Sequence, residues 1–306
     1  MIISVKNLKK YYKIHQKEPG FLGSIKSFIN RKYYDVKAVD GISFEIEEGE
    51  LVGFIGPNGA GKTTTLKVLS GLLYPTSGIV RVLGFEPFKR QAQFQKQFSL
   101  IMGQRNQLWW DLPPMESFIL NKEIYEIPNT DFKRVVNDLS YLLDVKDILN
   151  VQVRKLSLGQ RMKCELIAAL LHSPKILFLD EPTIGLDVVA QKNMRDFIKT
   201  YNKKFGATII LTSHYMGDVK ELCKRIIIIN DGKILYDGSL DDIIEKFSTH
   251  KVIEIDFYNG MHQSLRVPRD EVAKEAYKLL SKRNVLDLTI EDPPIEDVIR
   301  KFFKDA

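Results

Sequence analysis

The hydrophobic positions of the chain form two kinds of strand pattern. Residues 2–6 and 42–47 alternate apolar and polar side chains, which predicts half-buried strands. The segment LVGFI leads into a glycine-rich loop and then an apolar helix that ends near Gly71. Three further runs are almost continuously aliphatic, namely ILFLD, ATIILTSH and RIIIIN. Because such strands are buried on both faces, they predict a mainly parallel sheet covered by helices.

Two other regions depart from this pattern. No strand is indicated between residues 115 and 172, so we expect a mainly helical subdomain at about residues 104–172, inserted into an α/β body. The stretch NDGKILYDGS predicts a hairpin with an Asp-Gly turn that closes the body near residue 238. We therefore expect one domain at residues 1–238 and a small α+β domain at residues 239–306.

The small domain is predicted from short elements of both kinds. We expect strands at residues 251–257, 263–267 and 285–290, and helices at residues 269–283 and 294–303. The last helix carries an apolar stripe of Ile295, Val298, Ile299, Phe302 and Phe303. We interpret this stripe as the core of the small domain, with a dimer or regulatory contact as the alternative.

Composition is ordinary for a soluble globular protein. Of the 306 residues, 44% are hydrophobic and 27% are charged, and no apolar run approaches the roughly 18 residues that cross a bilayer. We expect no signal peptide, and we expect Cys164 and Cys223 to be reduced thiols. The net charge of +6 lies in the body, because the part after residue 238 is net acidic. A basic body suits polyphosphate ligands or an anionic membrane surface, although a solvated basic face explains it equally well.

The clearest chemical motif is GPNGAGKTTT, which follows a predicted strand and precedes a predicted helix, as a phosphate-binding loop does. Its residues are Gly56, Pro57, Asn58, Gly59, Ala60, Gly61, Lys62, Thr63 and Thr64. The glycines let backbone N–H groups wrap phosphates. Lys62 is expected to reach the β- and γ-phosphates, and Thr64 to donate to the α-phosphate. Thr63 is expected to ligate Mg²⁺.

A carboxylate pair ends the strand in ILFLDEP, beside the phosphate loop if the two strands are neighbours. Asp180 is expected to hold Mg²⁺, directly or through water. Glu181 is the next residue in the pleat and points elsewhere, where it can activate a water that attacks the γ-phosphate.

A second anion-binding feature is predicted in KLSLGQRMK, residues 155–163, where Ser157 stands at the head of an apolar-periodic helix. Together these motifs resemble the ATP-binding cassette (ABC) transporter ATPases over residues 1 to about 238. GPNGAGKTT resembles their Walker A motif, LSLGQ their signature, ILFLDEPT their Walker B motif with the catalytic glutamate, GLD their D-loop and IMGQRNQLWWDLP their Q-loop. Leu158 departs from the signature by replacing its first glycine. We expect that this position needs no positive φ and that activity survives.

The resemblance implies a P-loop ABC fold with a mainly parallel core sheet, an antiparallel β part and an inserted helical subdomain. It also implies hydrolysis of ATP with Mg²⁺ in a head-to-tail homodimer, where the signature helix of one copy covers the ATP bound by the other. Ser157, Gly159 and Gln160 would hold the partner's nucleotide, and Asp187 would order the partner's site.

Three more site residues follow from the order of the motifs. His214 matches the switch histidine that contacts the γ-phosphate, with a core histidine as the plain alternative. Gln104 matches the Q-loop glutamine, a Mg²⁺ ligand that senses the transported-substrate side, with Gln107 as the alternative. Tyr12 matches the aromatic residue that stacks on adenine, with Tyr11 or a plain strand-end tyrosine as alternatives.

Two segments carry no sharp motif. Residues 13–37 hold six basic and two acidic residues and predict a short amphipathic helix, which lies on a membrane surface, on a permease or on its own core. Its apolar face comprises Phe21, Leu22, Ile25, Phe28 and Ile29. Trp109 and Trp110 lie just past the Q-loop and are interpreted as interface anchors, with core packing as the alternative.

The resemblance therefore predicts the nucleotide-binding subunit of a bacterial ABC exporter. The finer similarity, in the C-terminal part and the Trp-Trp-Asp-Leu-Pro segment, is to drug- and viologen-type exporters. Such a subunit sits at the cytoplasmic face of the plasma membrane through integral membrane permease subunits, and no nucleic-acid partner is expected. An importer subunit, a soluble non-transport ABC protein and an ATP-binding regulator without turnover are the alternatives. Glu181 and His214 argue against the regulator.

Overall fold

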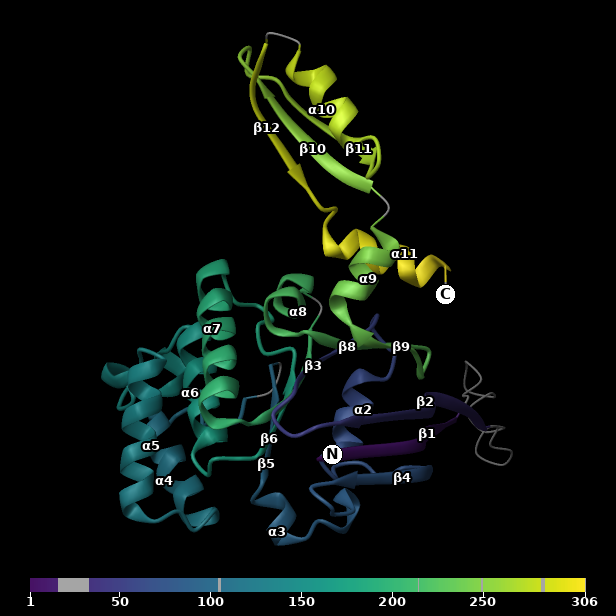
Figure 1. Ribbon diagram of the computed structural model, residues 1–306. Helices are drawn as coiled ribbons and strands as arrows, with labels where there is room; N and C mark the ends of the chain where they lie inside the picture. The colour runs from purple at the N-terminus through teal and green to yellow at the C-terminus, as the bar shows by residue number, and fades with distance from the viewer. Residues whose placement is uncertain (16–32, 104–105, 214, 249, 282–283, 306) are drawn as a thin grey trace, which may run out of the picture. The chain divides into compact units, whose positions relative to one another are not determined.

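The computed structural model describes residues 1–15, 33–103, 106–213, 215–248, 250–281 and 284–305. It divides into two compact units, Met1–Asp237 (unit 1) and Gly238–Ala306 (unit 2) (Figure 1). Within the described part of the chain, no helix combines the length and the apolar character that crossing a membrane requires.

A six-stranded sheet forms the centre of unit 1, with the strands in the order β5-β6-β7-β3-β8-β9. Their bounds are β3 (Leu51–Ile55), β5 (Phe98–Met102), β6 (Ile176–Asp180), β7 (Thr208–Thr212), β8 (Arg225–Asn230) and β9 (Lys233–Ser239). The pairs from β5 to β8 are parallel, which confirms the predicted parallel sheet. Asp231 and Gly232 have φ values of 46° and 74°, the left-handed pair that closes the predicted Asp-Gly hairpin.

A second, antiparallel sheet has the order β2-β1-β4. Its strands are β1 (Ile3–His15), β2 (Tyr33–Ile46) and β4 (Ser77–Val82). The first two are much longer than the alternating segments predicted from the sequence. Register shifts interrupt the β1–β2 pairing at three places, and each shift breaks the alternation of buried and exposed positions.

The longer strands take up both ends of the segment 13–37. Residues 13–15 belong to β1 and residues 33–37 to β2. The remainder, with the apolar residues Phe21, Leu22, Ile25, Phe28 and Ile29, lies outside the described residues.

The helix α2 (Lys62–Leu69) packs against β2, β4 and β6, so it lies between the two sheets of unit 1. The other helices of unit 1 are α3 (Ala92–Gln95), α4 (Pro114–Ile124), α5 (Asn129–Leu142), α6 (Leu158–Leu170), α7 (Val188–Phe205) and α8 (Met216–Leu222). The helix α6 packs on β5, and both α4 and α5 pack on α6 (Figure 1). The helical region predicted between the Q-loop and β6 is therefore present, and the described residues from 115 to 172 contain no strand.

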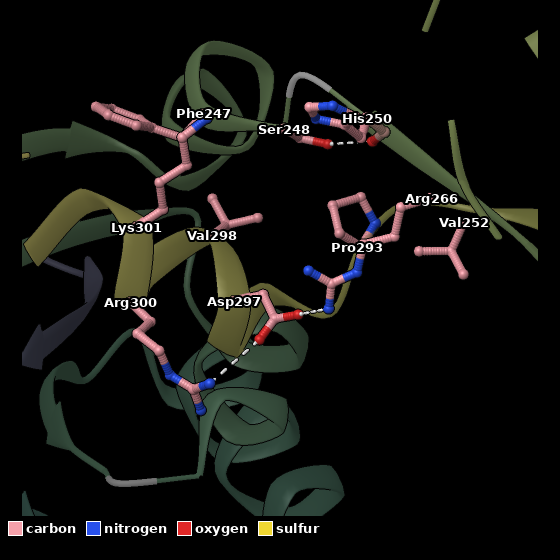
Figure 2. Close-up of a pocket in the computed structure, with 10 residues that line it drawn as sticks. All are labelled: Phe247, Ser248, His250, Val252, Arg266, Pro293, Asp297, Val298, Arg300 and Lys301. Atoms are coloured by element: carbon pink, nitrogen blue, oxygen red, sulfur yellow. Dashed lines mark hydrogen bonds and ion pairs between the residues drawn. The ribbon is translucent and has the colours of Figure 1, made fainter. Parts of the chain in front are cut away.

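Unit 2 contains a three-stranded antiparallel sheet in the order β11-β10-β12. Its elements are α9 (Leu240–Phe247), β10 (His250–Phe257), β11 (His262–Pro268), α10 (Val272–Leu280), β12 (Val285–Glu291) and α11 (Ile295–Asp305). The predicted strands and helices are all found, whereas α9 was not predicted. The helix α11 packs on α9, where the rings of Phe302 and Phe247 meet edge to face at 5.3 Å. The two helices line a cavity of about 560 Å³ with the start of β10 and with Arg266 of β11, which pairs with Asp297 (Figure 2).

Candidate ATP site

The loop between β3 and α2 is packed so closely that two of its positions require glycine. A Cβ atom at Gly56 would stand 2.1 Å from the carbonyl oxygen of Ile229. At Gly61, which has a φ of 108°, a Cβ atom would stand 2.4 Å from the carbonyl oxygen of Ala38. The loop is therefore pressed between β8 and β2, and its backbone leads directly into the N-terminus of α2. A helix N-terminus carries positive partial charge, which suits phosphate.

Lys62 is the first residue of α2, and its ammonium group is folded back onto the loop. It donates hydrogen bonds to the carbonyl oxygens of Gly56, at 2.7 Å, and Pro57, at 3.0 Å. Burial lowers the pKa of Lys62, and the negative charges of Glu181 and Asp180 oppose that shift. Among the described residues the hydrogen-bond acceptors of this buried cation are two neutral carbonyls, so it is suited to an anionic ligand, which would compensate its loss of hydration.

Thr63 lies beside Asp180, although the strands β3 and β6, whose pairing was the condition for placing the carboxylate pair at the loop, are not neighbours. The strand β7 lies between β3 and β6. The hydroxyl of Thr63 reaches across and donates to Oδ2 of Asp180 at 2.8 Å. Thr212, the last residue of β7, donates to Oδ1 of the same carboxylate at 2.6 Å. Two hydroxyl groups, one from the first turn of α2 and one from the end of β7, thus fix both carboxylate oxygens of Asp180.

Glu181 leaves the sheet by a route that the sequence did not predict. The strand β6 ends at Asp180, and Glu181 has a φ of 57°, so its direction is set by a left-handed turn rather than by the pleat. Its amide donates to the carbonyl oxygen of Thr212 at 3.0 Å and lies 3.2 Å from the Thr212 hydroxyl. A left-handed non-glycine residue costs of order 1–2 kcal/mol, and such residues cluster at functional sites.

Gly103 joins the start of the predicted Q-loop to this turn. Its amide donates to the carbonyl oxygen of Asp180 at 2.9 Å. A Cβ atom at Gly103 would stand 2.1 Å from the carbonyl oxygen of Glu181. Gly103 and Thr212 were not predicted from the sequence, although a threonine that ends a buried strand is a usable signal in a chain where another buried strand ends in Asp-Glu.

The residues at this point fit a magnesium ion. Thr63 and Asp180 bring a hydroxyl and a carboxylate oxygen together at 2.8 Å, and oxygen is the ligand atom that Mg²⁺ prefers. No cluster of three or more His, Cys, Asp or Glu side chains able to hold a metal occurs among the residues that the structure covers. Mg²⁺ would therefore need oxygen atoms from phosphate and water in addition.

The second predicted anion site is a regular helix N-terminus. Ser157 caps α6 in a capping box with Gln160, in which each side chain bonds the other residue's amide, at 3.2 and 3.0 Å. Leu158 opens the helix without a positive φ, as expected for the residue that replaces glycine. Ser157, Leu158 and Gln160 are exposed.

The N-termini of α6 and α7 lie side by side. A Cβ atom at Gly159 would stand 3.4 Å from Cβ of Ala190, and one at Gly185 would stand 3.1 Å from a methyl group of Leu158. Asp187 caps α7 by accepting the amide of Ala190 at 2.8 Å. The first residues of α7, Val188 and Val189, are 77% and 69% exposed. The signature and the D-loop therefore share one exposed surface that includes apolar side chains.

Tyr12 lies within β1 and pairs with Val36 of β2, two residues before Ala38, whose carbonyl oxygen packs on Gly61. The hydroxyl of the alternative, Tyr11, is engaged in a short hydrogen bond with Asp40, which raises the pKa of Tyr11 and lowers that of Asp40. The register thus places Tyr12 on β1, next to the strand β2 that borders the phosphate loop.

Two predicted site residues, Gln104 and His214, lie outside the described residues. The alternative to the first, Gln107, is described, and its side-chain amide donates to the carbonyl oxygen of Leu100 at 2.9 Å. Asp187, Ser157 and Gln160 are described but lie on the surface formed by α6 and α7, and no contact joins them to Lys62 or Asp180 among the described residues.

Comparison with known proteins gives the same assignment as this geometry. The family described as ABC transporter matches residues 39–184. The ABC transporter ATP-binding protein NatA of Bacillus subtilis is 35% identical over 220 residues, which cover 71% of this chain and 89% of NatA. The chain belongs to the ABC transporter ATP-binding proteins. The Nod factor export ATP-binding protein I of Burkholderia thailandensis is 31% identical over 87% of this ABC chain, and 85% of that protein is covered.

Solved structures agree with the fold of this ABC protein. An ATP-binding subunit of an ABC transporter has a TM-score of 0.66 and 25% identity, and the match covers 81% of this chain and 93% of that one. A second ATP-binding cassette, solved as a dimer in a post-hydrolysis state with ADP and Pi, has a TM-score of 0.64 and 22% identity, with 78% and 98% covered. The chain is an ABC-type ATPase, and the predicted ABC fold is confirmed.

Proposed function

We propose that this ATPase is the nucleotide-binding subunit of an ABC exporter, in which two copies bind two MgATP head to tail and drive a separate membrane permease. The observation that carries the dimer is the shared exposed surface of the α6 and α7 N-termini. A second copy would supply a ligand for that surface, because the ATP bound at the phosphate loop of one chain can contact Ser157 and Gly159 of the other. Two helix N-termini then bind one triphosphate, and the charge of the γ-phosphate joins the subunits.

Each chain contributes the remaining groups in this proposal. Gly56, Pro57, Asn58, Gly59, Ala60, Gly61, Lys62, Thr63 and Thr64 hold the phosphates, and Tyr12 stacks on the adenine. Thr63, Asp180 and Gln104 hold Mg²⁺, which supplies charge neutralisation at the phosphates. Glu181 takes a proton from the attacking water, and His214 contacts the γ-phosphate. Gln160 and Asp187 order the shared interface.

The permease contact is proposed at the segment after the Q-loop. Trp109 and Trp110 are 58% and 49% exposed, and the guanidinium of Arg161, on α6, lies over the ring of Trp110 at 5.6 Å. Exposed tryptophans are strong interface anchors. The stack connects this segment to the helix that Ser157 caps, so a permease bound at Trp110 contacts the signature helix through Arg161. Purifying the chain with its permease from native membranes, with and without Trp110→Ser, tests this contact.

Export rather than import is supported by the names of the relatives. These include proteins described as Nod factor export and bacitracin transport ATP-binding proteins, the latter from Bacillus licheniformis and 32% identical over 70% of this chain, with 69% of that protein covered. The location that follows is the cytoplasmic face of the plasma membrane, through the permease. An importer subunit remains the alternative, and transport in vesicles with the permease distinguishes the two by direction.

The dimer is tested by mixing two inactive variants. Lys62→Ala spoils the phosphate loop, and Ser157→Arg spoils the signature, so each homodimer has two defective sites. A mixed dimer has one site with both defects and one whole site, made from Lys62 of one chain and Ser157 of the other. Mixing equal amounts should return about a quarter of the parent rate, since half of the random dimers carry one whole site of two.

The control mixes differently tagged copies of Lys62→Ala, which must stay inactive, and tagged pull-down verifies that mixed dimers form. If the mixed dimers form and hydrolyse no ATP under conditions where the parent does, the two motifs do not share a site across the interface.

A further inference from the structure

A buried carboxylate outside the ABC motifs gathers three hydrogen-bond donors at the edge of the ATP site. Asp218, on α8, has no exposed surface. Its Oδ2 accepts from the hydroxyl of Thr183 at 2.5 Å and from the hydroxyl of Ser213 at 2.8 Å. Its Oδ1 accepts from Nη1 of Arg195 at 3.0 Å. Arg195 also pairs with Glu221 at 2.6 Å, so its charge is shared between two carboxylates of α8.

The three donors come from three segments that already carry proposed site residues. Thr183 stands two residues after Glu181 and precedes the D-loop. Ser213 directly follows Thr212, the residue that binds Asp180 and the amide of Glu181. Arg195 lies on α7, the helix whose N-terminus is the exposed D-loop surface.

Because Asp218 is buried, its carboxylate depends on these three donors. A carboxylate removed from water is costly unless its oxygens are occupied by donors, so all three bonds are strongly favoured together. The two hydroxyls share Oδ2, and this fixes the separation between the segment after Glu181 and the segment after Thr212. Ser213 also accepts the amide of Tyr215 at 3.0 Å, and its hydroxyl lies closer to Oδ2 of Asp218, at 2.8 Å, than to the carbonyl oxygen of Tyr215, at 3.3 Å.

Glu181 needs such an external restraint. Its left-handed backbone is strained, and a strained conformation persists only when its surroundings hold it. Thr212 holds its amide from one side, and the bond from Thr183 to Asp218 fixes the chain two residues later.

We propose that Asp218 is a positioning residue for ATP hydrolysis, which sets the place of Glu181 by fixing the Thr183 and Ser213 segments at one carboxylate and joins both to α7 through Arg195. The proposal rests on the proposed role of Glu181 as the general base. It assigns to Asp218 an effect on turnover and none on ATP binding, because Lys62 and the phosphate loop make no contact with it among the described residues.

The first test compares turnover and ATP affinity for Asp218→Asn and the parent. Asparagine keeps one acceptor oxygen but has no charge for Arg195, and its amide group clashes with one of the donors. The turnover number should fall about 10- to 100-fold, since a displacement of about 1 Å costs on that order, while KM and the affinity for ATP stay within about twofold.

The second test removes only one donor. Thr183→Val keeps the shape of the side chain without its hydroxyl, and Thr183→Ser keeps the hydroxyl. Valine should lower the turnover number at unchanged KM, and serine should restore it to near the parent. Combining Thr183→Val with Asp218→Asn should slow turnover little beyond Asp218→Asn alone, because both act through the same bond.

A matched control separates positioning from general loss of stability. Asp237 binds Arg225 through two hydrogen bonds, at 2.8 and 3.0 Å, at the far end of β8 and β9. Asp237→Asn should lower the unfolding temperature while the turnover number per folded chain stays at the parent value.

Three results would overturn the role of Asp218. These are a parent-like turnover number in Asp218→Asn, a rise in KM alone, or, if Asp218→Asn does not fold, a parent-like turnover number in Thr183→Val. A parent chain that binds ATP but does not hydrolyse it would instead refute the proposed transport-coupled turnover, whatever Asp218 does.

Discussion

Thr63 and Asp180 are joined by a hydrogen bond of 2.8 Å across an intervening strand. The strand β7 lies between β3, which leads to Thr63, and β6, which ends at Asp180. Thr212 is the last residue of β7 and binds the carboxylate of Asp180. Thr63 and Thr212 thus bind the same carboxylate from two different elements. The hydroxyl of Thr212 donates a hydrogen bond to Asp180 and accepts one from the amide of Glu181. It therefore fixes the position of the Asp180 carboxylate relative to the backbone of Glu181.

Removing that hydroxyl should affect both stability and turnover. Thr212→Val keeps the buried shape but leaves Oδ1 of Asp180 without its donor, which should cost about 1–3 kcal/mol in the free energy of unfolding. The turnover number should fall about tenfold or more, because both acidic residues lose a fixed position. Urea unfolding and ATPase assays measure the two effects. Thr212→Ser, which keeps the hydroxyl, is the control, and equal rates in the two variants would contradict the role of the hydroxyl.

Glu181→Gln should abolish steady-state hydrolysis and leave ATP binding intact. Glutamine keeps the size of the side chain and its backbone turn, but it does not accept a proton from water. Turnover and retained nucleotide are measured in the same preparation. Glu50→Gln, which changes a carboxylate bound to Arg225 instead, is the matched control and should turn over normally. Turnover of Glu181→Gln within about threefold of the parent would exclude Glu181 as the general base.

The residues that could be predicted from the sequence are those with a local signal. Lys62 and Asp180 were predicted because a glycine-rich loop and a strand end mark them in the chain. The parallel strands were found because both of their faces are buried. By contrast, β1 and β2 were predicted too short, since bulges interrupt the alternation that identified them.

The residues that were missed act through contacts between distant segments. Thr212, Gly103 and Asp218 meet their partners only after folding, and each looks ordinary among its sequence neighbours. The helix α9 was missed because it has only eight residues, although Ser239 at its N-cap and the two aspartates in its first turn are helix-start signals. The left-handed turn of Glu181 was missed because a glutamate is rarely expected in that conformation.

A buried glutamate on the signature helix predicts a pH dependence of stability. Glu165 is 1% exposed on α6, and burial raises its pKa to about 7, against the opposing effects of Arg161 and the amide of Gln107. Between pH 4.5, the ordinary pKa of a glutamate, and about pH 7, the folded chain therefore keeps the proton on Glu165, whereas the unfolded chain has lost it. Stability falls as pH rises through this window, because the folded state binds more protons there.

Glu165→Gln removes the group that titrates. Relative to the parent, the variant should gain roughly 2–3 kcal/mol more at pH 8 than at pH 5 in the free energy of unfolding. Urea unfolding of both proteins at the two pH values measures this difference. The other titrating groups are the same in the parent and the variant, so their effects on the free energy of unfolding cancel in the comparison. The same difference at both pH values would show that Glu165 is not held protonated by burial.

Gly103 should tolerate no side chain, because it presses on the turn that positions Glu181. An alanine there would bring its Cβ to 2.1 Å from the carbonyl oxygen of Glu181, so one of the two segments must move. Gly103→Ala should lower the free energy of unfolding by about 1–3 kcal/mol and the turnover number about 100-fold.

The matched control for this substitution is Gly217→Ala, because Gly217 lies on α8 with open space around its Cα and a φ that any residue adopts. Alanine should stabilise that helix by up to about 1 kcal/mol and leave turnover unchanged. If Gly103→Ala is as active as Gly217→Ala, the Q-loop start and the Glu181 turn move independently. If turnover is lost in Gly103→Ala alone, the backbone at the start of the Q-loop and the backbone of Glu181 cannot move independently. A shift of the Q-loop would then displace the carboxylate that is proposed to activate water, because the two backbones are already in close contact.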